Sequence, residues 1–459
     1  MKRVRPCRRR DTALRPIRQA QGKQAQGRPQ GRWGHPEQSR GAARRPKVLH
    51  VITRLIRGGA QENTLLTVGL TDRDRFEVHL AGGPEGEWLS RGRMAADRFH
   101  VIAALGNPIS PRRDLAAFAQ LLRLMRRERF AVVHTHTSKA GVLGRLAARL
   151  AGVPAIVHTP HGTVLHDVYF TPRQQRLVAW VKRTAARFSD AIITMSDCER
   201  DLYVARRIAP SNRFRTIYSG IDYSRFEDSP GGRDQVRRSL GLGEHDLMVF
   251  FPARYVPEKG HRFFFAAAEQ VMRTMPEVQV FLAGDGPLAQ EVAALHAASA
   301  FPDRVHALGF RRDVLELMSA AEVVVSASLS EGLPRTMVEA LLLERPVAAT
   351  DAGGTREVVL DKVTGMLVPC GDGGALAEAI LYLLRHPEEA ARMGAAGLER
   401  VRPLFDARAM VRRIEDLYQE CLGGEGPPIE HRRPFDRLRV TPTGVEGHPE
   451  RSRGAAVRS

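Results

Sequence analysis

The chain has 459 residues, of which 43% are hydrophobic and 26% charged, and its formal net charge is +19. A chain of this length can bury a large core and exceeds one ordinary domain, so we expect two domains and additional segments. Four cysteines and the lack of a Gly or Pro period exclude disulfide-framework, collagen-like and wholly disordered proteins. The composition predicts a soluble globular protein.

Most of the positive charge lies at the two ends of the chain. Residues 1–46 hold 14 Lys and Arg against two acids, and residues 426–459 hold 7 Arg against four acids, which leaves +4 for the body. A ten-residue segment at 34–43 recurs at 447–456 with nine identical positions. Both ends are polar and rich in Gly and Pro, so we expect disordered tails. The alternative for the first end is an Arg-rich transit peptide, although it lacks an amphipathic period.

Three further features bear on partners and location. A nucleic-acid site would need a basic folded face or basic residues interleaved with aromatics, so we expect no specific nucleic-acid partner. No stretch of about 18 uncharged apolar residues occurs, which predicts neither a spanning helix nor a signal peptide. The cysteines are isolated and lack metal-ligand or redox spacing. We therefore expect a cytoplasmic protein.

From Lys47 the body shows short apolar runs that alternate with helical periods. This pattern predicts parallel strands covered by helices on both faces. In the first half we expect strands at 47–53, 77–81, 131–135, 155–159, 191–195 and 215–218, and helices at 60–71, 113–127, 141–150 and 172–188. These elements predict a doubly wound, Rossmann-like domain over 47–235.

A polar stretch at 228–244 is predicted to link this domain to a second one of the same class over 243–404. Its strands are expected at 247–253, 278–283, 305–308, 322–327, 346–350 and 365–368. A last amphipathic helix, within 405–422, is expected to pack back on the first domain. Two such domains facing one another form a cleft at the carboxyl ends of both sheets, where open α/β sheets bind ligands.

The segment SLSEGLPRTMVE at 328–339 directly follows one of these strands. Glu331 falls in the turn, Pro334 suits the first helical position, and Glu339 lies more than one turn inside the helix. Free N–H groups at 333–336 can bind phosphate, and the two carboxylates can accept hydrogen bonds from sugar and ribose hydroxyls. The spacing alone fits a helix-capping Glu331 and a solvent-facing Glu339 equally well.

The chain from about 47 to 422 resembles the retaining glycosyltransferases of family 4, which have the GT-B fold of two facing Rossmann-like domains. Glu331 and Glu339, separated by seven residues, match that family's E-x7-E motif. The resemblance implies a nucleotide-sugar donor domain over 243–404 and an acceptor domain over 47–235. It also implies that Glu331 holds the donor sugar and that Glu339 binds the ribose. The resemblance further implies that five residues between these two glutamates bind the donor, namely Gly332, Leu333, Pro334, Arg335 and Thr336.

Two loops of the first domain take part in the resemblance. The family's glycine loop corresponds to Gly58 and Gly59. Glycines between a strand and a helix let the backbone approach a ligand closely. A plain tight turn is the alternative. The family's histidine corresponds to His161, which follows the strand at 155–159 and is implied to meet the donor sugar. A capping or solvated histidine is the alternative there.

The family's basic pair corresponds to Arg254 and Lys259, after the first strand of the second domain. The resemblance implies that these cations neutralise the departing diphosphate, a task that a metal performs in other enzymes. By the same analogy, Arg254, Lys259, Glu331 and His161 are the catalytic residues. The chain has Ser219 where the family usually has Asn, which leaves the donor contacts of that loop open.

Gly284 opens the segment GDGPLA, which fits the dinucleotide fingerprint G-x-G-x-x-A. A dehydrogenase would need an acid at the end of the next strand, about 20 residues on, and the run at 305–308 ends with none. The resemblance instead places Gly284 and Phe310 on the donor side. The dehydrogenase is therefore the weaker interpretation.

Five histidines fall within 33 residues, and two of them, at alternate positions of a strand, share one face: His134, His136, His158, His161 and His166. Such spacing can bind zinc in a hydrolase, but carboxylates are scarce nearby. Residues that line the cleft are the simpler interpretation. We expect neither a metal nor another cofactor.

The stretch at 169–183 mixes aromatic and basic residues on a predicted helix. An ordinary amphipathic helix with a solvated basic face is the simpler interpretation. The alternative is peripheral contact with the anionic inner face of the membrane, next to a lipid-linked acceptor.

Together these features predict a metal-independent hexosyltransferase that moves a sugar from a nucleotide diphosphate sugar, a UDP-sugar by expectation, to an acceptor hydroxyl on a carbohydrate or lipid-linked sugar. The segments at 58–61 and 134–141 resemble capsular and exopolysaccharide enzymes, which implies cell-surface polysaccharide or lipopolysaccharide assembly. The alternatives are a GT-B sugar-nucleotide epimerase or phosphorylase and a non-catalytic carbohydrate- or nucleic-acid-binding protein. Neither explains why four charged residues of the predicted site follow strand ends.

Overall fold

A computed structural model describes residues 45–162, 171–227 and 232–423 of the chain. The described residues contain two sheets, and all strand pairs in both are parallel. The predicted α/β class with two doubly wound sheets is confirmed. The described part from Arg45 onward groups into one compact unit, so the domain boundaries near 235, 243 and 404 stay predictions.

The first sheet has the order β3-β2-β1-β4-β5-β6-β7. Its strands are β1 (Lys47–Ile52), β2 (Glu77–Gly82), β3 (Arg98–Val101), β4 (Val132–His136), β5 (Ala155–Thr159), β6 (Ala191–Thr194) and β7 (Phe214–Thr216). Chain order reverses between β1 and β4. In open α/β sheets the ligand site lies outside the carboxyl ends of the strands at such a reversal.

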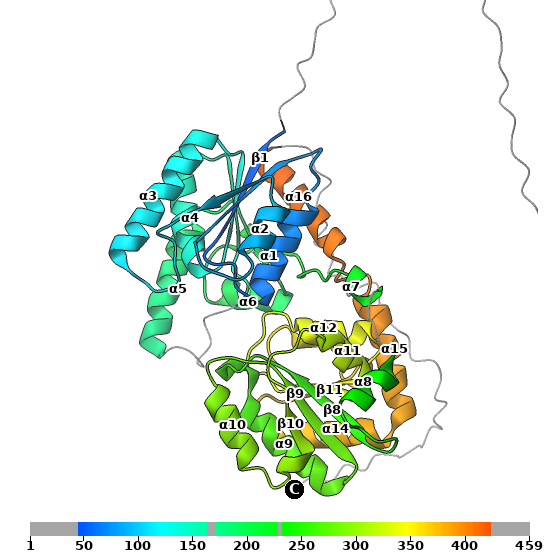
Figure 1. The fold of residues 1–459 in the computed structure, drawn as a ribbon. Helices are drawn as coiled ribbons and strands as arrows, with labels where there is room; N and C mark the ends of the chain where they lie inside the picture. Colours follow the sequence, from blue (N-terminus) through cyan, green and yellow to red (C-terminus); the bar gives the residue numbers. More distant parts are fainter. Residues whose placement is uncertain (1–44, 163–170, 228–231, 424–459) are drawn as a thin grey trace, which may run out of the picture. The chain divides into compact units, whose positions relative to one another are not determined.

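Helices cover both faces of this sheet (Figure 1). One face carries α1 (Gly59–Leu70), α2 (Leu89–Ala95) and α16 (Ala407–Cys421), and the other carries α3 (Pro111–Glu128) and α4 (Ser138–Ala151). Val48 and Ile52 of β1 point to the α1 and α16 side, whereas Leu49 and Val51 point to the α3 and α4 side. Burial on both faces explains why these strands read as continuous apolar runs. The remaining elements of this half are α5 (Pro172–Ala186), α6 (Asp197–Ala205), η1 (Ser211–Arg213) and α7 (Ser224–Glu227).

The second sheet has the order β10-β9-β8-β11-β12-β13. Its strands are β8 (Leu247–Pro252), β9 (Val278–Ala283), β10 (Val305–Ala307), β11 (Val323–Ser326), β12 (Val347–Thr350) and β13 (Met366–Val368). Val249 and Phe251 pack on one face with α9 (His261–Thr274) and α14 (Gly373–Arg385). Met248 and Phe250 pack on the other with α11 (Val314–Ala320) and α12 (Arg335–Leu342). Chain order reverses between β8 and β11, so a second site is expected there.

The other elements of this half are α8 (Arg233–Ser239), η2 (Pro257–Lys259), α10 (Ala289–Ala297), η3 (Pro302–Arg304), α13 (Thr355–Val358) and α15 (Pro387–Val401). The polar stretch at 228–244, predicted to link the two domains, contains the helix α8, which the sequence did not predict. Although α8 itself is polar, Val236 packs on the core and Arg237 donates to Glu322 at 3.1 Å. Tertiary contacts therefore stabilise a helix that its own sequence pattern does not predict.

Two short elements between the predicted strand at 77–81 and the helix at 113–127 were not expected from the sequence, namely α2 and β3. β3 is an edge strand of four residues, and none of its side chains is fully buried. Its apolar pattern is therefore too weak to predict a strand. Among the described residues, no helix combines the length and hydrophobicity that a membrane span needs.

Candidate functional site

The paired strands β8 and β11 bring two predicted site residues together at the carboxyl edge of the second sheet. Lys259 ends η2, which follows β8, and Glu331 lies in the loop that follows β11. The Lys259 ammonium forms an ion pair with the Glu331 carboxylate. Ser328 Oγ donates to Glu331 Oε1 at 2.7 Å. These contacts hold the carboxylate and the ammonium at one place in the site.

The two paired side chains are mostly buried, whereas the other predicted cation of this loop is exposed. The side chains of Lys259 and Glu331 are 23% and 10% exposed, so water screens their interaction only weakly. Arg254, in the loop that joins β8 to η2, is exposed. Gly284, after the neighbouring strand β9, approaches so closely that a Cβ there would lie 1.8 Å from Ala253 O. A side chain at 284 would therefore displace the loop that carries Arg254.

The start of α12 differs by one residue from the prediction. Pro334 was expected at the first helical position, but it is the N-cap, and α12 begins at Arg335. Arg335 N donates to Leu333 O at 3.0 Å, so one of the amides expected to be free is engaged. Leu333 is buried. The amide of Thr336 stays in the first turn of α12, where helices leave N–H groups unpaired.

The loop after Glu331 also meets the first half of the chain. A Cβ at Gly332 would lie 3.2 Å from Gly162 Cα, next to His161. Similarly, a Cβ at Gly59 would lie 3.3 Å from Arg335 Cδ. The glycine loop after β1 and the histidine loop after β5 are thus both in reach of the E-x7-E segment. This places the residues predicted from both halves in one region.

Arg335 makes several of the polar contacts of this junction. Its Nη1 donates to Ser219 Oγ at 2.7 Å and to Gly220 O at 2.8 Å. Asn63 Nδ2 donates to the same Ser219 hydroxyl at 2.8 Å. Arg335 Nη2 lies 3.4 Å from Glu62 Oε2. The Arg335 side chain, predicted to bind the donor, is therefore engaged with residues from the first half.

Glu339 lies one helical turn beyond Arg335 and faces the same group of charges. Its nearest cation is Arg225, whose Nη1 lies 3.6 Å from Glu339 Oε1 and 3.0 Å from Glu62 Oε1. Burial raises the pKa of Glu339, and the nearby guanidinium groups of Arg335 and Arg225 oppose that rise. Two glutamates and two arginines thus form a neutral cluster in which Glu339 is shielded from bulk water.

His161 has an unusual backbone and a neutral ring. Its φ of +58° lies in the left-handed region, which non-glycine residues adopt uncommonly. Burial, together with the nearby Arg335, lowers the pKa of His161 to about 3. Its Nε2 lies 2.9 Å from His136 Nδ1, while its buried Nδ1 has no hydrogen-bond partner in the described part of the chain. The ring therefore offers one unused polar atom.

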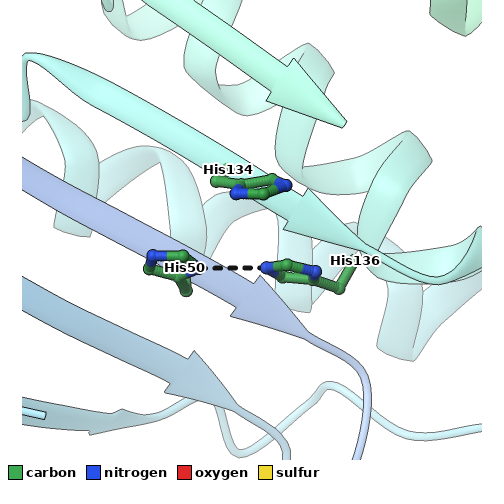
Figure 2. Close-up of side chains that lie close together, drawn as sticks. All are labelled: His50, His134 and His136. Carbon is green, nitrogen blue, oxygen red and sulfur yellow. Dashed lines mark hydrogen bonds between the residues drawn. The ribbon is translucent and has the colours of Figure 1, made fainter. Parts of the chain in front are cut away.

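Three further rings continue from His161 into the first sheet. Figure 2 shows His50 of β1 beside His134 and His136 of β4, with His50 Nδ1 3.0 Å from His136 Nε2. One nitrogen from each of these three rings lies within 4.8 Å of the other two, so among the described residues they form the group that could hold one metal ion. Each nitrogen already has a hydrogen-bond partner; for His134 these are Tyr418 Oη and Thr159 Oγ1. An ion would have to displace those bonds.

The remaining predicted residues lie apart from these two groups or outside the described residues. Phe310 is 45% exposed, and the Arg57 guanidinium lies 4.4 Å from its ring centroid. His158 is buried beside Thr135 and does not join the row of rings. His166 and the beginning of the aromatic and basic stretch lie outside the described residues. On α5, Leu177 and Trp180 are 61% and 58% exposed.

Sequence reasoning missed several residues of the site, among them His50, Glu62, Asn63, Arg225 and Tyr418. His50 carried a signal, because a polar residue in the apolar run of β1 requires a buried partner. The others carried none, because their roles depend on contacts across more than 100 positions of sequence.

Comparisons with known proteins agree with this arrangement. Residues 57–225 match the model described as Glycosyltransferase Family 4, and residues 232–400 match the model described as Glycosyl transferases group 1. The UDP-Gal:alpha-D-GlcNAc-diphosphoundecaprenol alpha-1,3-galactosyltransferase of Escherichia coli is 27% identical, over 73% of this chain and 87% of that protein. EpsD of Bacillus subtilis, which is named as a glycosyltransferase, is 30% identical over 75% of this chain and 89% of that protein. The crystal structure of HepE from Anabaena in complex with UDP-glucose superposes with a TM-score of 0.71 at 24% identity, over 82% of this chain and 100% of that one.

Two parallel sheets with a shared group of charged and polar residues define a GT-B enzyme that transfers sugars. The chain belongs to glycosyltransferase family 4. The predicted fold, family and enzyme class are therefore confirmed. The roles of individual site residues stay predictions.

Proposed function

We propose that this glycosyltransferase is a retaining, metal-independent hexosyltransferase that uses a UDP-sugar. The observation that carries the proposal is the Lys259–Glu331 pair at the reversal point of the second sheet, in contact range of the His161 loop. A cation, a carboxylate and a helix start at one sheet edge suit a ligand with a diphosphate and several hydroxyls. The complexes of HepE with UDP and UDP-glucose and the UDP-Gal substrate named for the Escherichia coli relative support UDP as the nucleotide.

Each site residue has a task in this proposal. Arg254 and Lys259 bind the diphosphate and stabilise the negative charge that develops on it. Glu331 and His161 accept hydrogen bonds from hydroxyls of the donor sugar. Glu339, buried beside Arg225, accepts hydrogen bonds from the ribose. When the donor binds, Lys259 exchanges part of its contact with Glu331 for the diphosphate, and this exchange frees Glu331 for the sugar.

The transfer itself needs no group from the protein as a nucleophile. The acceptor oxygen bonds to the anomeric carbon on the face from which the diphosphate departs, and the bond between that carbon and the diphosphate oxygen breaks. The acceptor's hydroxyl proton passes to the departing diphosphate oxygen. The configuration at the anomeric carbon is retained, and Arg254 and Lys259 take the part that a divalent metal plays elsewhere.

The acceptor proposed is a sugar hydroxyl on a carbohydrate or a lipid-linked sugar of cell-surface polysaccharide assembly. The diphosphoundecaprenol-linked acceptor named for the Escherichia coli relative supports this class. The exposed Leu177 and Trp180 of α5, with Arg173 and Arg176 on the same helix, suit peripheral contact with an anionic membrane face. Such contact would bring the site to a lipid-linked acceptor.

The proposal is tested on the full-length protein by thermal unfolding with UDP, GDP and their hexose derivatives, each with and without EDTA. A ligand that binds only the folded state raises the unfolding temperature as its concentration exceeds Kd. We expect a shift with UDP-sugars that EDTA leaves unchanged. A shift that EDTA abolishes would contradict metal independence, and a larger shift with GDP-sugars would contradict UDP.

Product analysis tests the reaction. Incubation of the selected UDP-sugar with GlcNAc-diphospho-lipid or oligosaccharide acceptors should yield UDP and a new glycoside with the anomeric configuration of the donor, as NMR of the product reports. Release of a rearranged sugar nucleotide or a sugar phosphate in place of a glycoside would contradict transfer and indicate an epimerase or a phosphorylase.

A further inference from the structure

A continuous row of hydrogen bonds leads from the ring of His161 into the core of the first sheet. It runs from His161 Nε2 to His136 Nδ1 at 2.9 Å and from His136 Nε2 to His50 Nδ1 at 3.0 Å. It continues from His50 Nε2 to Tyr418 Oη at 3.4 Å and from Tyr418 Oη to His134 Nδ1 at 2.7 Å. The last step joins His134 Nε2 to Thr159 Oγ1 at 2.8 Å. We call these six residues the histidine row; Figure 2 shows its centre.

The rings of this row are neutral. His50, His134 and His136 are fully buried, and burial lowers the pKa of each, to about 3 for His50. A neutral imidazole has one N–H donor and one bare nitrogen acceptor. Each link between two rings has a donor on one side and an acceptor on the other, so the direction of one such bond fixes the next. The buried Tyr418 hydroxyl has no further partner among the described residues, so its hydrogen must serve one of its two links. With that condition, only two arrangements of protons satisfy every link.

In the first arrangement, all four histidines carry the proton on Nε2. Tyr418 donates to His134 Nδ1 and accepts from His50 Nε2, and His161 Nδ1 is a bare acceptor. In the second arrangement, all four histidines carry the proton on Nδ1, and His161 Nδ1 is a donor. The tautomer of His161 is thus coupled to a phenol on α16, more than 250 positions along the chain.

Two observations favour the first arrangement. In the first arrangement the Tyr418 hydroxyl donates to its nearer partner, His134 at 2.7 Å, and only accepts from the farther one, His50 at 3.4 Å. In addition, His161 Nδ1 is buried without a partner, and a buried unpaired acceptor is more readily tolerated than an unpaired N–H. Both observations place the proton of His161 on Nε2.

We propose that Tyr418, His50 and His136 are positioning residues that hold His161 in its Nε2-protonated tautomer, so that Nδ1 is an acceptor for a hydroxyl of the bound sugar. The assignment of that sugar rests on the proposed function, but the tautomer does not. The backbone beside two of these rings is also unusual: Thr137, directly after His136, has a φ of +63°, and His161 itself has a φ of +58°. The fold therefore strains the backbone beside both rings that lie nearest the site.

The test is nitrogen-15 NMR of histidine side chains in the full-length protein, which reports which ring nitrogen carries the proton. We expect Nε2-protonated signals for His50, His134, His136 and His161 in the wild type. In Tyr418→Phe, His50 loses its acceptor and His134 its donor, so the signals of His161 and His136 should show a mixture of tautomers. Activity should fall about 2- to 10-fold in kcat/KM for the donor sugar, as expected for one hydrogen bond of altered direction, with the KM for the acceptor unchanged.

An internal control lies on the same sheet. His79 Nδ1 is 3.0 Å from His100 Nε2, and the other side of His79 contacts the Glu77 carboxylate at 2.9 Å. This pair is separate from the histidine row, and its signals should be identical in wild type and Tyr418→Phe. His50→Asn is the second variant, because it keeps a polar atom near His136 but breaks the link to Tyr418. We expect His50→Asn to give the same mixture of tautomers at His161. It therefore tests the inference even if Tyr418→Phe does not fold.

Two results would overturn the inference. One is a His161 tautomer that stays the same in both variants. The other is binding of about one Zn²⁺ per chain that His50→Asn abolishes, because the rings would then be metal ligands rather than a hydrogen-bonded row. A failure of the proposed function is a different result: the wild type would show the expected tautomers, and the variants would change them, without any sugar transfer.

Discussion

The two sheets have equivalent reversal points, but their chemistry differs. At β8 and β11 the site residues are charged, with Lys259 paired to Glu331 and an exposed Arg254 in the loop that follows β8. At β1 and β4 the buried polar groups are the neutral rings of His50, His134 and His136. The same topology therefore places a charged pair at one reversal point and a row of uncharged buried rings at the other.

This difference has a physical consequence for ligand binding. Charged groups that are partly exposed attract a diphosphate strongly, because the ligand is itself charged. Neutral rings buried in the core cannot compensate such a charge, but they can orient a hydroxyl. This comparison fits the proposal that the nucleotide binds at the second sheet and the neutral sugar groups bind at its junction with the first, and the following substitutions test that proposal.

The largest effect is expected at the charged edge. Lys259→Ala should lower kcat by about 100- to 1000-fold, because the developing charge on the diphosphate loses a preorganised cation. The measurement is steady-state transfer from the donor at saturating acceptor. The matched control is Lys47→Ala, which removes another mostly buried ion pair, between Lys47 and Glu128 at 3.0 Å, from a different region. A Lys259→Ala enzyme as active as Lys47→Ala would refute the assignment of the diphosphate to this edge.

The next effect concerns the buried histidine rings of the first sheet. It is a dependence of the free energy of unfolding on pH. His136 is neutral in the folded protein, whereas an unfolded histidine takes up a proton below a pKa of about 6.5. The unfolded state therefore binds more protons in this range, and the free energy of unfolding falls as the pH decreases from about 6.5 toward 4. Each such histidine contributes up to about 1.4 kcal/mol per pH unit.

Urea unfolding of wild type and His136→Gln at pH 7, 5.5 and 4.5 measures this dependence. The variant should show a shallower slope of stability against pH, by about one proton. The control for the loss of a histidine outside the buried row is His386→Gln, at an exposed position on the second half. Equal slopes in all three proteins would mean that the rings are already protonated in the folded state.

A smaller loss is expected for the ribose contact. Glu339→Gln keeps the shape of the side chain and removes the charge that Arg225 faces at 3.6 Å. Affinity for UDP should fall about 10-fold, in line with the loss of a hydrogen bond to a charged group, while kcat at saturating donor changes little. Calorimetric titration with UDP gives the affinity. Unchanged affinity would require another residue to recognise the ribose.

Much of this architecture is predictable from sequence, for a reason visible in β1 and β8. Strands buried on both faces form continuous apolar runs, and helices between them have a different period. Lys259 and Glu331 are predictable as neighbours of the site because both follow such runs. The pairing of His50 with His136 is not, because it depends on the register in which His50 lies opposite His134 across two strands.

Contacts from the end of the chain were less predictable still. Tyr418 reaches His134 only because α16 packs on the first sheet, and no local pattern marks that phenol. Likewise, α8 is stabilised by Arg237 and Glu322, which are 85 positions apart. Such tertiary contacts override local propensity, so sequence patterns locate elements better than they locate polar networks.

The smallest effect is expected where the two edges meet. Ser219 Oγ accepts from Arg335 at 2.7 Å and from Asn63 at 2.8 Å, so Ser219→Ala leaves two donors without this acceptor. Arg335 retains Gly220 O, so the free energy of unfolding should fall by only about 1 kcal/mol. Ser219→Asn, which restores the residue usual in the resembled family, supplies an acceptor and should recover part of that loss. If Ser219→Ala lowered donor affinity more than stability, Ser219 would contact the ligand itself, and the junction would belong to the donor site.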